Sequence, residues 1–151
     1  MQNRVTYLVH GIHSEDRGAS TVVRVAPYLS QHSVIVNAAY GYIGPVGAIF
    51  KNRKIARRLM LASSRNNCEG NHAVGHSNGC AIIVEALRQG AKFKSILLIN
   101  PALKANTVFP SGDYTITVIH TKHDRAVRAA RFFDAIPFLG TAISLTKKSW
   151  G

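Results

Sequence analysis

A candidate catalytic centre stands out in the stretch Gly75-His76-Ser77-Asn78-Gly79, which fits the pattern G-x-S-x-G. Residues 71–74 before it are typical of a short strand, and residues 80–88 after it are typical of a helix. A turn this tight holds its central residue in a strained conformation, so it needs neighbours without bulky side chains. The helix N-terminus behind it favours developing negative charge. The stretch therefore predicts a nucleophilic Ser77, against the alternative of a glycine-rich turn that merely contains a serine.

Backbone amides beside this serine could stabilise the oxyanion that acyl transfer creates. His10 and Gly11 end the first apolar run of the chain, and the loop after them could carry one such amide. We expect the N–H groups of Ile12, in that loop, and of Asn78, just past the nucleophile, to hold the oxyanion. His10 itself is expected to be a structural hydrogen-bonding residue rather than a base.

A serine hydroxyl needs an adjacent base, normally a histidine that a carboxylate orients. Asp124 lies in the loop after the apolar run 114–120, where its carboxylate could orient such a histidine. The alternative is a helix N-cap aspartate, because a helix is expected over 126–135. Asp113 precedes the same apolar run and should lie at the opposite edge of the fold, so Asp124 is the candidate acid.

The composition indicates one globular domain over residues 1–151, because 46% of the chain is apolar. No segment has the pattern of a secretory signal, and no apolar run reaches the ~20 residues of a membrane span. The two cysteines, Cys68 and Cys80, show no metal-type spacing. The sequence therefore implies no metal or organic cofactor and favours a reduced, cytoplasmic setting.

The net charge of +12 is high for a small enzyme, and its densest part is the segment 51–60. At helical spacing its basic side chains gather on one side, with apolar side chains facing the core. These basic residues are Lys51, Arg53, Lys54, Arg57 and Arg58. They predict either a weak anionic partner, such as nucleic acid or a membrane surface, or a solvated helix face. No aromatic residue interleaves with them, so no base-stacking platform is indicated.

Strand-like and helix-like stretches alternate along the chain, which predicts an α/β fold with a doubly wound, mostly parallel sheet and helices on both faces. The expected strands are residues 5–9, 34–36, 71–74, 95–100, 114–120 and 142–145. The expected helices are residues 20–31, the basic segment, 80–88 and 126–135. Sites in such sheets form at the carboxyl ends of the strands. The loop after His10, the Ser77 turn and the loop after His120 should therefore share one edge.

The sequence resembles the α/β-hydrolase superfamily and is similar to its small lipase-like and carboxylesterase-like members. The resemblance rests on residues 8–11, 75–79, 98–101 and 124–127, and it extends over nearly the whole chain in order and spacing. It implies a sheet ordered 2-1-3-4-5-6 and a triad of serine, acid and histidine. Thr121 stands where the superfamily commonly has a glycine three residues before the acid.

The resemblance also implies a catalytic histidine after the acid, yet no histidine follows Asp124 in this sequence. Three explanations stay open: the sequence ends before that histidine, the base comes from elsewhere, or the protein is inactive. We expect the first. His13, in the oxyanion loop, and His123, beside Asp124, lie on the correct edge and are the candidate substitute bases.

These residues together predict a serine hydrolase of carboxylesterase or lipase type, which cleaves a small-molecule ester or amide through an acyl-enzyme. The small size leaves little room for a lid, so we expect an open, shallow site lined by Tyr40, Tyr42 and Ile43. The alternative is a catalytically inactive binding module with a hydrolase-like fold, whose positive surface engages nucleic acid or anionic lipid.

Overall fold

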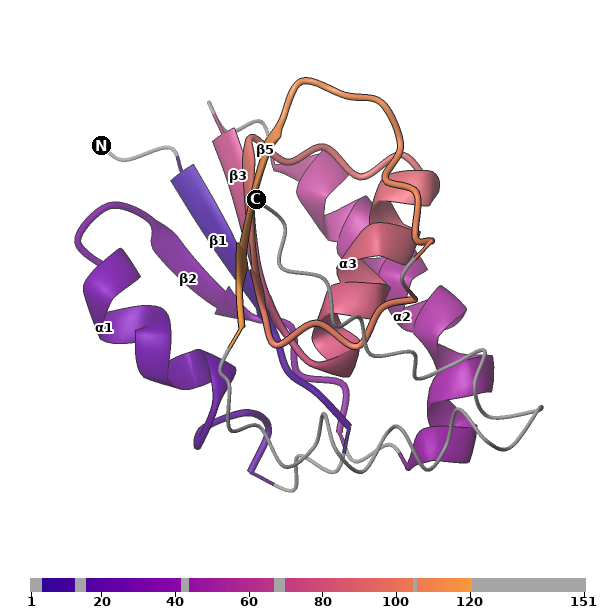
Figure 1. The fold of residues 1–151 in the computed structure, drawn as a ribbon. Coiled ribbons are helices and arrows are strands. Elements are labelled where there is room, and N and C mark those ends of the chain that lie inside the picture. The colour runs from indigo at the N-terminus through magenta and orange to yellow at the C-terminus, as the bar shows by residue number, and fades with distance from the viewer. Residues whose placement is uncertain (1–3, 13–15, 42–43, 67–69, 105, 121–151) are drawn as a thin grey trace.

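A computed structural model describes residues 4–12, 16–41, 44–66, 70–104 and 106–120, and Figure 1 shows how their elements are arranged. The strands are β1 (Arg4–Val9), β2 (Val34–Asn37), β3 (Gly70–His76), β4 (Ser95–Ile99) and β5 (Thr115–Ile119). The helices are the 3-10 helix η1 (Val22–Val25) and the α-helices α1 (Ala26–Leu29), α2 (Pro45–Arg65) and α3 (Asn78–Arg88).

The five strands form one parallel sheet in the order β2-β1-β3-β4-β5. This confirms the predicted fold class and the predicted order of the first five strands. Val9 pairs with Gly75 and His76 pairs with Ile99, so β1, β3 and β4 end at the same edge of the sheet. The strand expected over 142–145 and the helix expected over 126–135 lie outside the described residues.

Helices cover both faces of the sheet, as expected. The helices α2 and α3 pack against each other on one face, while η1 and α1 lie on the other (Figure 1). The larger core lies on the α2–α3 side and includes Tyr7, Leu59 and Ile83. The smaller core lies under η1 and contains Leu8, Val22 and Val74. Alternate residues of β1 thus point into different cores, as the alternation of a strand requires.

The single helix expected over 20–31 is instead two short helices, and Pro27 is the reason. A proline has no N–H, so residue 27 cannot donate the α-helical hydrogen bond to the Val23 carbonyl. The Ala26 N–H donates to Val23 instead, which closes a 3-10 turn. The α-helical pattern begins only at Ala26, with proline in its first turn.

The basic helix is longer than the charged segment that predicted it. α2 runs from Pro45 to Arg65 and buries Ile55, Ala56 and Leu59 on its inner face. Its start is set by Pro45 in the first turn, after Gly44 in an extended conformation. Among the described residues, no helix is long and apolar enough to cross a membrane.

Candidate active site

The serine of the G-x-S-x-G pattern lies on a sharp turn between β3 and α3. Ser77 has φ 53 and ψ −119, a backbone conformation that residues with a side chain rarely adopt. Backbone hydrogen bonds hold the turn on both sides: the Ser77 N–H donates to the Ile99 carbonyl over 3.0 Å. The Ser77 carbonyl accepts from the N–H groups of Cys80 at 3.1 Å and Ala102 at 3.2 Å. The strain is therefore imposed by β3, α3 and the segment after β4 together.

The two glycines of the pattern are sterically required. A Cβ on Gly79 would lie 2.1 Å from the carbonyl oxygen of Val9, a backbone atom of the neighbouring strand β1. A Cβ on Gly75 would lie 2.7 Å from the Cδ1 of Ile83 and 3.0 Å from the backbone nitrogen of Cys80. The turn can therefore approach β1 and return into α3 only because both positions lack a side chain.

The loop after β1 lies directly against this turn. A Cβ on Gly11 would lie 3.1 Å from the Ser77 Cβ and 3.4 Å from the His76 carbonyl oxygen. Ile12, the next residue, is partly buried and packs against the larger core. Asn78 is the first residue of α3, and the first N–H groups of a helix have no intrahelical partner. The two predicted oxyanion residues, Ile12 and Asn78, thus belong to segments that meet at Ser77.

His10 is a structural residue, as expected, and its partner is Tyr40. Its Nδ1 hydrogen-bonds the Gly11 carbonyl over 2.8 Å, and its Nε2 accepts the Tyr40 N–H over 3.4 Å. These partners assign the proton to Nδ1. The two rings stack with centroids 4.0 Å apart, and burial lowers the pKa of His10. Because both ring nitrogens are occupied, His10 is not available as the base.

Tyr40 holds the loop after β1 through its hydroxyl, a role that the sequence did not predict; its expected place in the lining of the site stays a prediction. Its hydroxyl donates to the carbonyl of His10, with the Gly11 carbonyl 3.2 Å away. Burial raises the pKa of this phenol far above its ordinary value, so it stays protonated. Tyr42 and Ile43, the other two expected lining residues, lie outside the described residues.

A reciprocal pair of amides joins α2 to the turn, and the sequence did not single it out. Asn52 Nδ2 donates to Asn78 Oδ1 over 2.8 Å, and Asn78 Nδ2 donates to Asn52 Oδ1 over 3.0 Å. Asn78 is 1% exposed, so this pair satisfies both ends of a buried amide. One signal was present: Asn52 is an uncharged residue in a run of cations, on the inner side of the helix with Ile55 and Leu59.

The acid and the base of the predicted triad stay predictions. Asp124, His123 and His13 all lie outside the described residues. Among the described histidines, His72 hydrogen-bonds through Nδ1 with the hydroxyl of Ser95 over 2.7 Å. Ser95 is the first residue of β4, so this contact lies at the opposite edge of the sheet from Ser77. Asp113 forms an ion pair with Lys94 over 2.9 Å at the amino ends of β4 and β5, the edge expected for it.

The thiol of Cys80 lies in the first turn of α3, close in sequence to Ser77. Burial raises the pKa of the Cys80 thiol, which is fully enclosed three residues after the nucleophile. The thiol is therefore a small core group rather than a second nucleophile. Within the described part of the chain, no three His, Cys, Asp or Glu side chains gather closely enough to hold a metal ion.

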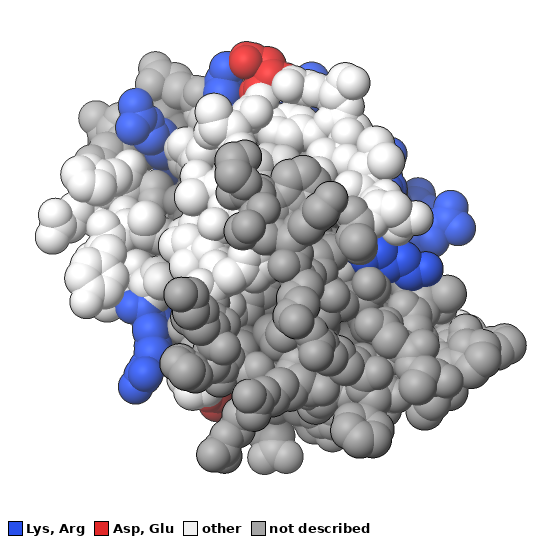
Figure 2. Space-filling view, in the orientation of Figure 1, with Lys and Arg blue, Asp and Glu red and all other residues white. Residues whose placement is uncertain are grey.

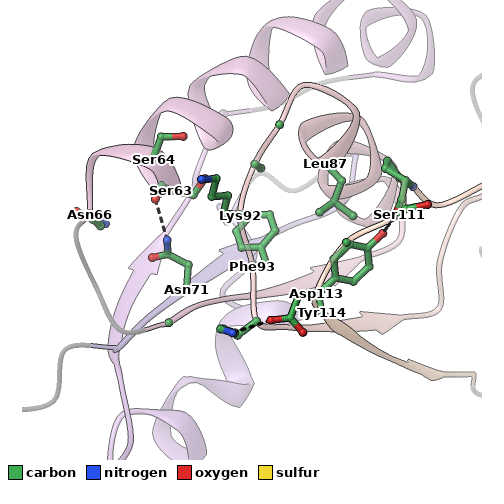
Figure 3. A pocket seen from close by; sticks show the side chains of 16 residues that line it. Ser63, Ser64, Asn66, Asn71, Leu87, Lys92, Phe93, Ser111, Asp113 and Tyr114 are labelled. Carbon is green, nitrogen blue, oxygen red and sulfur yellow. Dashed lines mark hydrogen bonds and ion pairs between the residues drawn. The ribbon is translucent and has the colours of Figure 1, made fainter.

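One cavity in the described part of the chain lies away from Ser77. It has a volume of about 680 Å³ and opens at the amino-terminal edge of the sheet, between the end of α2 and the segment before β5 (Figure 3). Its lining includes Asn71, Lys92, Phe93 and Tyr114, without a nucleophile beside a base. In parallel sheets, sites form at the carboxyl ends of the strands. The turn at Ser77 is therefore the better candidate for chemistry.

Comparison with known proteins supports the fold alone. No protein-family model matches the sequence, and no curated protein matches it significantly. Among solved structures, the chain is similar to a protein of Xanthomonas campestris pv. campestris, provisionally described as a hydrolase of the alpha/beta superfamily. The TM-score is 0.53 with 16% sequence identity, and the match covers 95% of this chain and 86% of that chain. The protein thus has a minimal α/β-hydrolase fold.

Proposed function

We propose that this protein is a serine hydrolase of esterase or lipase type, with Ser77 as the nucleophile. The observation that carries the proposal is the conformation of Ser77, φ 53 and ψ −119, between a strand and the first residue of a helix. A strained residue that its surroundings impose is a hallmark of functional sites. Two glycines that admit no side chain maintain it.

The reaction would proceed through an acyl-enzyme. The Ser77 hydroxyl attacks the carbonyl carbon of the substrate while a base takes its proton. The N–H groups of Ile12 and Asn78 donate to the resulting oxyanion. Collapse of this intermediate breaks the C–O or C–N bond, and the base returns the proton to the leaving alcohol or amine. Water then attacks the acyl-enzyme in the same way and releases the acid.

The proposed base is a histidine that Asp124 orients. His10, at the end of β1 beside the proposed oxyanion loop, is engaged at both ring nitrogens by Gly11 and Tyr40. His13 and His123 are the candidates that this chain itself offers. A carboxylate holds the histidine in the correct tautomer and orientation, and it stabilises the imidazolium that forms when the histidine takes the proton.

Labelling with a fluorophosphonate probe tests the proposal. We expect the wild-type chain to be labelled, Ser77→Ala to lose all labelling, and Ser64→Ala, on the exposed surface of α2, to keep it. Labelling that persists in Ser77→Ala, or no labelling of the wild type, would contradict an activated Ser77. His13→Ala and His123→Ala then show which histidine is the base, because its loss should slow labelling about 100-fold or more.

A further inference from the structure

An exposed basic face runs along α2. Six of its 21 residues are Lys or Arg, and none is Asp or Glu. Among the described residues, the ion pairs join Arg88 to Glu85 and Lys94 to Asp113, and neither involves α2. Figure 2 shows Lys and Arg side chains around the rim of one face of the molecule, with few acidic side chains between them. The charge on α2 is therefore not neutralised by its described neighbours.

Two large apolar side chains lie on the same face of α2. Phe50 is 73% exposed and Leu61 is 40% exposed, although both belong to a helix whose other side is buried in the core. Helical spacings of four, three and four residues place four side chains in one exposed stripe. This stripe consists of Phe50, Lys54, Arg57 and Leu61. The cations therefore lie between two apolar ends about 16 Å apart.

We infer that this face of α2 binds the surface of an anionic lipid membrane. Phe50 and Leu61 would enter the boundary between headgroups and acyl chains, and Lys54 and Arg57 would contact lipid phosphates and carboxylates. Lys51, Arg53 and Arg58 are also exposed and add charge on the flanks. The helix lies in the plane of the surface, with its inner side still packed on α3.

The apolar ends of the stripe favour lipid over nucleic acid as the partner. Contacts to nucleic-acid phosphates come from cationic and polar groups, so they would leave the apolar side chains of Phe50 and Leu61 in water. A lipid interface takes up both kinds of side chain in one contact, because long basic side chains reach the headgroups while apolar ones are buried.

The position of α2 gives such binding a consequence for the site. The amide pair of Asn52 and Asn78 fixes the middle of this helix to the turn that carries Ser77. A protein bound through α2 would therefore hold its candidate active site beside the lipid surface. The binding itself does not depend on Ser77, so it can be tested whether or not the chain is a hydrolase.

Co-sedimentation with vesicles tests the inference on the full chain. We expect binding to mixed phosphatidylcholine–phosphatidylserine vesicles, little binding to pure phosphatidylcholine, and weaker binding as salt rises. Lys54→Glu with Arg57→Glu should weaken the affinity at least about tenfold. Phe50→Ser should weaken it about fivefold while leaving binding to duplex DNA unchanged. Ser77→Ala should bind vesicles as the wild type does.

The matched control reverses the charge of one Arg and one Lys outside α2. Arg24→Glu with Lys104→Glu changes the net charge equally at exposed positions on η1 and in the loop after β4. It should lower vesicle affinity at most about threefold, because charges far from the contact are screened. Equal losses in both double variants would show a net-charge effect and overturn the inference. The inference would also be overturned if Phe50→Ser bound anionic vesicles as tightly as the wild type does, or if the wild type bound DNA more tightly than anionic vesicles.

Discussion

Ser77 has a strained backbone conformation that its neighbours impose. Its positive φ costs about 1–3 kcal/mol for a residue with a side chain, and a glycine at the same position would avoid most of that cost. The sequence nevertheless places serine there, between two glycines whose own lack of a side chain the packing demands. A strained hydroxyl-bearing residue where glycine would fit better is the pattern expected when function, and not stability, selects the residue.

This strain predicts that Ser77→Gly is more stable than Ser77→Ala by about 1 kcal/mol. Both variants lack the hydroxyl, and only alanine keeps the Cβ that disfavours φ 53. The greater flexibility of glycine in the unfolded chain offsets part of the gain. Urea titration of the two variants measures the difference in the free energy of unfolding.

Ser64 offers the matching comparison, since it is exposed on α2 with helical backbone. There Ser64→Gly should be less stable than Ser64→Ala by up to about 1 kcal/mol, because glycine is a poor helix former. The order of stability should therefore reverse between the two positions. If alanine is the more stable at both, Ser77 is not strained in the folded protein.

At the scale of elements, α2 does more than cover the sheet. Its Asn52 side chain holds Asn78, whose backbone N–H begins α3 and is a proposed oxyanion donor. The loop after β1 is held in the same way, by Tyr40 through the carbonyls of His10 and Gly11. Each proposed oxyanion segment is thus fixed by a side chain from the region between β2 and the middle of α2.

Asn52→Ala should therefore impair both stability and the reactivity of Ser77. Removing the Asn52 amide takes both reciprocal hydrogen bonds from the buried Asn78 side chain, which costs about 1–3 kcal/mol. A displaced turn should also slow fluorophosphonate labelling about tenfold, because small misplacements at a reacting centre are costly. Asn37→Ala is the control: Asn37 is exposed, and its side-chain amide donates to the Arg17 carbonyl over 3.2 Å, away from Asn78. Labelling of Asn52→Ala at the rate of Asn37→Ala would show that the pair does not position the site.

The elements were predictable where local sequence decides them. The predicted strands match β1 to β5 to within two residues at each end. The helix over 20–31 was wrong in type because one proline changes the hydrogen-bond pattern. The extent of α2 was underestimated, since its charged middle shows a clear pattern while its ends depend on packing and on Pro45.

For the molecule as a whole, alternation of strands and helices was enough to predict the parallel sheet and the shared edge at which β1, β3 and β4 end. The side-chain network behind that edge was not predictable. Tyr40 and Asn52 contact residues 30 and 26 positions away, and nothing local to either residue indicates its partner. Motifs reveal residues that meet on one turn, whereas contacts between distant segments follow from packing.

Two of the described histidines link the stability of the whole molecule to pH. Burial lowers the pKa of His10 at the end of β1, and burial with the nearby Arg4 lowers the pKa of His72 in β3. In the unfolded chain both would titrate near 6.5. Below that pH the unfolded chain takes up protons that the folded chain resists, so acid favours unfolding.

We therefore expect the contribution of these two histidines to the free energy of unfolding to be complete above about pH 7. It should be lost as the pH drops through 6.5 toward the lowered pKa values of the folded protein. Each histidine can contribute a slope of at most about 1.4 kcal/mol per pH unit. His72→Gln should remove one of these contributions in urea titrations at a series of pH values. Ser95→Ala removes the hydrogen-bond partner of His72 but keeps its imidazole, so it should change the stability while retaining the slope. An unchanged slope in His72→Gln would mean that this histidine takes up its proton equally well in the folded and the unfolded chain.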